Sequence, residues 1–369
     1  MLSLPPVEVS TLQLVWFGLI AVLWIGYFVL EGFDYGVGIL LPVIGKSEAE
    51  RRAMLTTLGP VWDGNEVWLL TAGGATFAAF PQWYATLFSG FYLPLLLILV
   101  ALILRGVAFE YRSKHASASW RQRWDIAIVV GSFLPALLWG VAFGNIVRGV
   151  TFVSTPVAGL PGQPSTGDSP IYGGTFFDLL NPYSLIGGLT TLLLFTTHGA
   201  IFLSLKTGGT IRERAHALVP KVGLVAAVFA VIFLVWSQLA YSNDKMWTWI
   251  PVLLAAVCWL AGLGADRIKR DGWAFVFSAV TLGLAVVALF GMLFPYVMPN
   301  LDRSLPGLTI AGASSTQYTL TVMTWVAVIM TPIVLCYQAW TYWVFRKRLT
   351  AEMIPDPESG SLDLRPVRV

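Results

Sequence analysis

A stretch from Gly59 to Leu70, with the sequence GPVWDGNEVWLL, places ionisable side chains among large apolar ones. Asp63 and Glu66 are its two acids, Asn65 lies between them and Trp62 precedes them. Carboxylates can take up and release protons or bind a cation, and in a membrane they usually have such a task. Spacing by three residues puts the two acids on neighbouring faces of a helix. The stretch therefore indicates a proton or ion function.

Four further charged residues accompany this stretch in the first third of the chain. Glu31 and Asp34 form a second pair spaced by three, and Arg105 precedes Glu110 in LRGVAFEYR. One interpretation is a hydrated funnel lined by acids. The other is an electrostatic staple in which Arg105 pairs with one carboxylate and the remaining acids reach interfacial water. The staple is favoured for Glu31, Asp34 and Glu110, and proton or ion transfer for the acids of the opening stretch.

The remaining candidates for metal or haem chemistry are few. His198, in FTTHGA, is the one histidine that falls well inside an apolar run. A b-type haem usually takes two axial ligands, so a hydrogen-bonded histidine beside Thr196 and Thr197 is the favoured interpretation. Cys258 and Cys336 lie in apolar runs without CxxC spacing, which argues against a metal or disulfide role. We predict no catalytic residue and no metal site in this chain.

The composition requires these residues to be positioned by membrane helices. Of the 369 residues, 56% are hydrophobic and 12% are charged, far fewer than in soluble domains. Apolar runs recur at the length that crosses a bilayer as a helix. The prediction is an all-α, polytopic transmembrane bundle, and no feature indicates nucleic-acid binding. Its nine spans are 12–41, 54–80, 84–109, 125–147, 183–205, 219–241, 248–265, 272–296 and 318–345.

Basic residues predict the orientation of these spans. Of the 23 Lys and Arg residues, all except Arg148, Lys245 and Arg303 fall on the same side of the predicted membrane. Loops rich in Lys and Arg remain in the cytoplasm. The N-terminus is therefore predicted outside and the C-terminus in the cytoplasm. The first apolar run has no basic segment before it and no cleavage site, so it is interpreted as a retained helix.

The spans suggest a single membrane domain over 1–369 with a 4+4+1 organisation. The first four-helix half is 1–147, the second is 183–296, the ninth helix is 318–345 and a cytoplasmic tail follows over 346–369. Glycines such as Gly36, Gly73 and Gly74 are expected to allow helices to approach closely. With a rise of 1.5 Å per residue, Asp63 is expected roughly 13 Å into its span from Met54, in the cytoplasmic half of the membrane.

Three motifs resemble a known family. EGFDYGVGILLP (31–42), GPVWDGNEVWLLTAGGATFAAFP (59–81) and FSGFYLPLLLILVALILRGVAFEYR (88–112) look like subunit II of the cytochrome bd quinol oxidases. The likeness is strong over 15–112 and mainly topological beyond it. In that family the aspartate of a cytoplasmic proton path matches Asp63, framed by Trp62, Gly64 and Asn65.

The resemblance implies a role in a quinol:oxygen oxidoreductase of the bacterial cytoplasmic membrane. Such a complex oxidises quinol and reduces dioxygen to water. Its haem b and haem d groups and its quinol-oxidising loop belong to subunit I, so this chain is expected to bind no cofactor alone. Partners are then subunit I, small single-span subunits, the quinol substrate and lipids. Ubiquinone or menaquinone, and a structural quinone in this subunit, stay open.

Two other functions compete with this one. A proton- or ion-coupled secondary transporter also carries intramembrane acids, but it often has inverted repeats with broken helices at matching positions, which the sequence does not display. A purely structural scaffold for a haem-bearing partner is the third hypothesis. A red partner that co-purifies would separate both oxidase hypotheses from the transporter.

Overall fold

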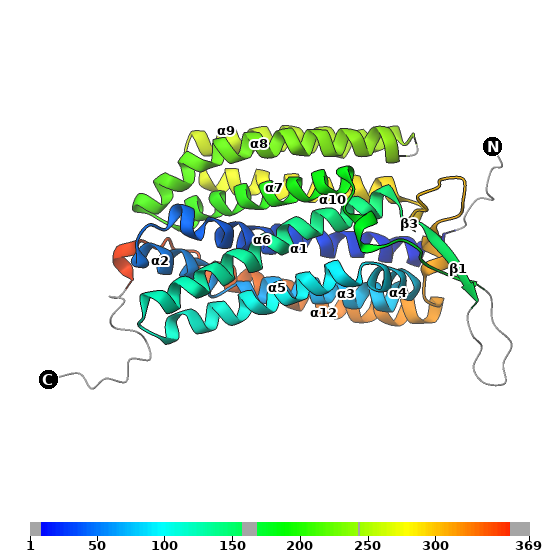
Figure 1. The fold of residues 1–369 in the computed structure, drawn as a ribbon, viewed down its shortest axis with the longest axis horizontal. Coiled ribbons are helices and arrows are strands. Elements are labelled where there is room, and N and C mark those ends of the chain that lie inside the picture. The colour runs from blue at the N-terminus through cyan, green and yellow to red at the C-terminus, as the bar shows by residue number, and fades with distance from the viewer. Residues whose placement is uncertain (1–8, 157–167, 243, 355–369) are drawn as a thin grey trace.

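The computed structural model describes residues 9–156, 168–242 and 244–354. Long helices lie side by side along one axis, with small two-stranded sheets at one end and α2 at the other (Figure 1). The helices of the bundle are α1 (Thr11–Ile44), α2 (Glu48–Leu58), α3 (Trp62–Ala79), α4 (Pro81–Gly90), α5 (Tyr92–Tyr111), α6 (Ala118–Arg148), α7 (Pro182–Lys206), α8 (Gly209–Tyr241), α9 (Trp249–Arg267), α10 (Asp271–Leu293) and α12 (Gln317–Val344).

Short elements fill the connections between these helices. The antiparallel pairs are β1 (Phe152–Pro156) with β2 (Asp168–Tyr172), and β3 (Tyr296–Met298) with β4 (Leu308–Thr309). The remaining turns are α11 (Ile310–Ala313) and the 3₁₀ segments Arg112–Lys114, Phe176–Leu179, Met246–Thr248 and Ala351–Met353. The predicted tail is described only as far as Ile354, and residues 355–369 lie outside the described part.

Eight helices of the described residues are long and apolar enough to cross a membrane. They coincide with eight of the nine predicted spans, which confirms a polytopic helical membrane fold. The exception is 54–80, where the prediction of one continuous helix is wrong because α2 ends at Leu58 and α3 begins at Trp62. Pro60 is the physical reason: it has no N–H to donate to the carbonyl of Thr56, four residues earlier.

The predicted span 84–109 is also divided. α4 ends at Gly90 and α5 begins at Tyr92, with Phe91 between them. Pro94 lacks the N–H that a continuous helix would direct to the carbonyl of Gly90, so the break follows from the same chemistry. The apolar part of this span is carried by α5, and α4 adds a separate ten-residue helix before it.

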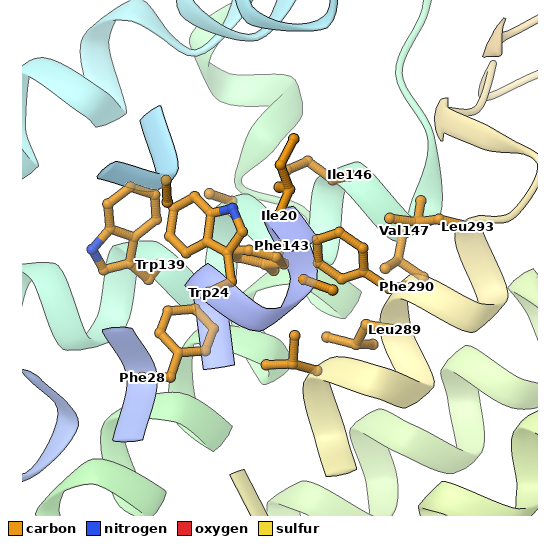
Figure 2. Packing of buried hydrophobic residues seen from close by; sticks show 14 of the residues in the cluster. Ile20, Trp24, Phe28, Trp139, Phe143, Ile146, Val147, Leu289, Phe290 and Leu293 are labelled. Carbon is orange, nitrogen blue, oxygen red and sulfur yellow. The ribbon is translucent and has the colours of Figure 1, made fainter. Parts of the chain in front are cut away.

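An aromatic cluster joins α1 to α6 and α10 (Figure 2). Trp24 of α1 meets Phe143 of α6 edge to face, with ring centroids 4.9 Å apart. Trp139 approaches the same indole at 4.9 Å, and Phe290 of α10 lies 6.5 Å from Phe143. Offset and edge-on pairs of this kind stabilise packing beyond the area that they bury. α1 is therefore held in the interior, where its polar residues are shielded from lipid.

The contact between α1 and α7 is backbone on backbone. A Cβ added to Gly36 would lie 2.1 Å from the carbonyl oxygen of Phe195, and one added to Gly199 would lie 2.5 Å from Gly36 Cα. Close approach at Gly36 was predicted, and the structure bears it out. Gly73 and Gly74 of α3 differ, because nothing in the described chain lies within 4 Å of a Cβ at either position.

The last helix is the least covered by the rest of the chain. Within α12 only Leu320 is buried, whereas most of α7 is buried. α12 runs beside α3 and α1 (Figure 1). At one end Trp16 Nε1 donates to the carbonyl of Leu320 over 3.3 Å. At the other end Arg348, just after the helix, donates to Asp271 over 2.6 Å. α12 is thus anchored at both ends and exposed between them.

Candidate functional site

Glu31 and Asp34 lie on the inward face of α1 and are completely buried. They are one helical turn apart, as the spacing predicts, so both carboxylates point into the space shared by α1, α3 and α5. Burial of this completeness contradicts one part of the staple interpretation, in which the acids that Arg105 does not pair reach interfacial water. A buried carboxylate needs a charged or hydrogen-bonding partner, and each of the two acids has a different one.

Arg105 of α5 is the partner of Glu31. Its Nη2 donates to Glu31 Oε1 and, over 2.5 Å, to Glu66 Oε1 on α3. The guanidinium also lies 4.6 Å from the ring centroid of Tyr35, within cation–π range. Arg105 was expected to pair with one acid, and it pairs with two. The three helices that carry these residues are therefore joined through one buried cation.

Asp34 takes its hydrogen bond from Asn65. Asn65 Nδ2 donates to Asp34 Oδ2 over 2.8 Å, and Asn65 is itself completely buried. The Asn65 Oδ1 atom accepts from the hydroxyl of Tyr342 over 2.7 Å. Asn65 thus links the acid on α1 to the last helix, α12. Sequence reasoning missed Tyr342, because a tyrosine near the end of an apolar helix is interpreted first as part of an interfacial belt.

Asp63 lies apart from this cluster. It is exposed in the first turn of α3, and it makes no hydrogen bond or ion pair to the rest of the described chain. The expected depth of roughly 13 Å assumed a continuous helix from Met54. Because Pro60 breaks that helix, Asp63 lies instead at a helix N-terminus, where a carboxylate is favoured by the helix dipole. Trp62 packs on Phe109, with centroids 5.2 Å apart.

Glu110 does not join Arg105. Its side chain is exposed, and it forms none of the salt bridges found within the described residues. Arg112, which directly follows α5, forms the ion pairs at this end of the helix: it donates to Glu48 over 2.8 Å and to Asp125 over 2.5 Å. A structural ion pair was predicted for Glu110, and at this end of α5 Arg112 forms it instead.

The cluster around Arg105 contains more acid than base, with Glu31 and Asp34 completely buried and Glu66 partly exposed. Glu31, Asp34 and Glu66 surround the one cation, Arg105. If all three acids were ionised, the group would carry a net charge of −2, which is costly in a low-dielectric interior. Glu31 Oε2, Asp34 Oδ1 and Arg105 Nη1 are buried and make no hydrogen bond within the described chain. The cluster can therefore hold a proton, and its unpaired oxygens are the places where that proton would bind.

His198 is engaged by hydrogen bonds on both sides of its ring. Nδ1 lies 2.7 Å from Ser278 Oγ and Nε2 lies 3.0 Å from the carbonyl of Val29. The ring also stacks on Phe275 at 4.8 Å. A hydrogen-bonded histidine was predicted, but with neighbouring threonines as partners instead of residues from α1 and α10. With both nitrogens bonded, this ring does not fit the role of a haem ligand.

Among the described residues, no group of three or more His, Cys, Asp or Glu side chains could hold a metal ion. The acids near Arg105 are bridged by its guanidinium and by Asn65, so their geometry suits protons and hydrogen bonds. This arrangement can store and orient a proton in the membrane interior.

A separate ionic network connects α2 to α8 at the α2 end of the bundle. Glu50 accepts from Arg214 and Thr210, over 2.8 and 2.7 Å, and from the amides of Lys46 and Ser47. Burial alone would raise the pKa of Glu50, but these hydrogen bonds outweigh it and lower the pKa to about 2. Glu50 is therefore a carboxylate at neutral pH and fastens α2 to α8.

These features define a class of protein: a multi-pass helical membrane protein with a buried cluster of acids around one arginine. The family follows from comparison. Residues 12–345 match the model of cytochrome bd terminal oxidase subunit II, and the chain belongs to this family. It is therefore a component of a haem-dependent quinol oxidase complex of respiratory electron transport, in which a subunit I is its partner.

Curated relatives agree along nearly the whole chain. The cytochrome bd-I ubiquinol oxidase subunit 2 of Escherichia coli K12 is 38% identical, over 94% of this chain and 98% of the relative. The cytochrome bd ubiquinol oxidase subunit 2 of Bacillus subtilis is 40% identical, over 92% and 98%. A chain of the bd oxidase structure from Geobacillus thermodenitrificans shares the fold with a TM-score of 0.72 at 17% identity, covering 92% of this chain and 100% of that one.

Proposed function

We propose that this chain supports the haem-bearing subunit I and contributes a proton path from the cytoplasm toward the site of oxygen reduction. The single observation that carries the proposal is the group of Glu31, Asp34 and Glu66 around the buried Arg105, which holds more carboxylates than cations. Four protons are consumed for each dioxygen reduced to water. A path of ionisable groups inside the membrane could supply them from one side only and so separate charge.

The proposed topology has nine spans, with the N-terminus outside and the C-terminus in the cytoplasm. The eight long apolar helices together with the broken α2–α3 segment support this number. The three basic residues that were predicted outside lie near the β3 end of the bundle. There Arg303 donates to the carbonyl of Arg148, and Lys245 donates to the carbonyl of Met292. The α2 end carries the ionic networks. Because loops rich in Lys and Arg remain in the cytoplasm, the α2 end is proposed to lie on the cytoplasmic side.

The face formed by α3 and α12 is proposed to bind subunit I. Asp63 is exposed on α3, and a carboxylate facing lipid would be costly. Gly64, Gly73 and Gly74 leave open space on the same helix, which allows another helix to approach closely. α12 exposes Trp325 along with most of its other side chains. A protein partner would cover this face, and Asp63 would pass protons across it.

The haem b and haem d groups are assigned to subunit I. His198, the histidine expected inside an apolar span, is bonded through both ring nitrogens and so offers no free nitrogen to iron. The proposed location is the bacterial cytoplasmic membrane, with lipids around the remaining faces and quinol as the substrate of the complex. Small single-span subunits and a structural quinone remain part of the same proposal.

The alternative is a proton- or ion-coupled secondary transporter, and the buried acids alone would suit it. No arrangement of broken helices in the second half matches the break at Pro60, since α7, α8, α9 and α10 each run without interruption. Purification separates the two functions. The oxidase requires a red, haem-containing partner bound to this chain, and a transporter would be colourless.

Asp63→Asn tests the proton path in the purified complex. It keeps the size and a polar tip but removes the titratable proton. The expected result is an assembled complex with all its haems, slower quinol oxidase turnover and slower proton uptake after oxygen binds. Asp63→Glu, the matched control, should retain more activity. If Asp63→Asn turns over like the wild type across the pH range, protons do not pass through Asp63, and wild-type turnover in Asp34→Asn as well would place the path in the partner.

A further inference from the structure

A row of hydrogen bonds leads from Trp68 to the buried acid Asp34. Trp68 Nε1 donates to Gln338 Oε1 over 3.0 Å. Gln338 Nε2 in turn approaches Asn65 Oδ1 at 3.5 Å, and Asn65 Nδ2 donates to Asp34 Oδ2 over 2.8 Å. The row passes from α3 to α12, returns to α3 and ends on α1. Gln338 is half-buried in a helix most of whose residues are exposed.

The two ends of this row determine the direction of every bond in it. An indole N–H can only donate, so Gln338 must present its oxygen to Trp68 and its NH₂ group to Asn65. At the far side, the carbonyl of Leu30 can only accept, and Asn65 Nδ2 lies 3.4 Å from it. Both constraints require the same orientation of the Asn65 amide, with its oxygen toward α12 and its NH₂ toward Asp34. Without them, an amide could rotate by half a turn and reverse its role.

The Trp68 ring packs against Gly26 of α1. A Cβ added to Gly26 would lie 2.1 Å from the Trp68 ring, so only glycine at this position leaves room for the indole. The side chain is therefore held with its N–H directed at Gln338.

We propose that Trp68 and Gln338 are positioning residues that keep Asn65 as a donor to Asp34 and so set how readily Asp34 gives up its proton. An NH₂ group that faces a carboxylate stabilises the ionised form, and an amide oxygen in the same place stabilises the acid form. The inference rests on the proposed proton path and adds to it the residues that tune one of its acids.

Other charged and titratable groups also act on Asp34. Glu31 lies on its own helix, Glu66 is presented by α3 and Arg105 by α5. Tyr342 of α12 bonds the same Asn65 oxygen as Gln338. Its hydroxyl can donate or accept, so it fits either orientation of the amide and does not choose between them. On the α12 side the choice falls to Trp68 through Gln338, and on the α1 side the carbonyl of Leu30 favours the same orientation.

Trp68→Phe tests this inference in the purified complex. The variant removes the N–H and keeps an aromatic ring over Gly26. Infrared difference spectra of the complex at a series of pH values follow the carboxylic C=O band of Asp34, identified by its loss in Asp34→Asn. Without the indole donor the amides of Gln338 and Asn65 can rotate, and an Asn65 oxygen turned toward Asp34 replaces its charge-assisted hydrogen bond. The midpoint of that band should therefore move upward by about one pH unit. Gln338→Leu, which removes the row at its centre, should move it in the same direction.

The matched control is Trp259→Phe, which deletes an indole hydrogen bond of 2.9 Å to the carbonyl of Gly223, away from the cluster. It should leave the Asp34 midpoint unchanged. A wild-type midpoint in both Trp68→Phe and Gln338→Leu would overturn the inference, as would a carboxyl band of Asp34 that does not change with pH. Wild-type turnover and proton uptake in Asp34→Asn would instead count against Asp34 in the proposed path, while the infrared titration would still report on the hydrogen-bond row.

Discussion

The guanidinium of Arg105 on α5 contacts the carboxylate of Glu31 on α1, and both side chains are completely buried. The pair connects two helices that have few other contacts with each other. A buried charge without its partner is far more costly than the pair is beneficial. This relationship gives the first prediction.

Arg105→Ala should lower the stability of the complex by about 3–5 kcal/mol, because it leaves Glu31 buried without a cation. Thermal unfolding and haem content of the purified complex measure the effect. Arg105→Lys is the control, since it keeps the charge and should recover part of the loss. Normal haem content and an unchanged Tm in Arg105→Ala would mean that the pair has no role in assembly.

The isolated chain should bind no haem when it is expressed without subunit I. Both ring nitrogens of His198 are already bonded, to Ser278 and to the carbonyl of Val29. An optical spectrum of the chain alone, compared with that of the intact complex, provides the measurement. A haem spectrum from the isolated chain that disappears in His198→Ala would contradict the prediction.

Gly36→Ala should destabilise the chain by about 1–3 kcal/mol or more, because the added methyl group would collide with the backbone of α7. Gly18→Ala is a matched control on the same helix, since nothing lies within 4 Å of a Cβ there. Thermal unfolding of the two variants should differ clearly. Equal Tm values would show that α1 and α7 can separate without cost.

Glu50→Gln should destabilise the complex at neutral pH by about 1–2 kcal/mol, since it weakens charge-assisted hydrogen bonds. The pKa of Glu50 is lowered from 4.5 to about 2 on folding. Its contribution is therefore fully present above the unfolded value and is lost as the pH falls through the folded one. The difference in Tm between variant and wild type should be constant from pH 7.5 to about 5.5 and then narrow. A difference that grows toward acidic pH would contradict this sign.

The sequence predicted the helical membrane fold because runs of apolar residues and the placement of Lys and Arg report directly on lipid and on topology. The spacing of Glu31 and Asp34 also predicted correctly that they share a helix face. The depth expected for Asp63 assumed a continuous helix from Met54, and Pro60 interrupts that helix. Proline was visible in the sequence, but apolar runs in membranes often continue through proline, as α6 does at Pro135.

The partners of the acids could not be predicted in the same way. Asn65 and Tyr342 are 277 residues apart along the chain, and their contact depends on how α12 lies beside α3. Gln338 carried a signal that was not used: a lone amide within an apolar helix needs a hydrogen-bonding partner in the membrane. The signal identifies a polar contact but not the residue that provides it.

The order in which the chain is made has a consequence for the site. α1 and α3 leave the ribosome early, whereas α12 begins at Gln317 and follows every other long helix of the described chain. Until then Asn65 has neither Tyr342 nor Gln338 to bond, and the face that bears Asp63 lacks its neighbour. A chain that stops before Gln317 would therefore be inserted with Glu31, Asp34 and Asn65 in place but without the α12 side chains that bond Asn65.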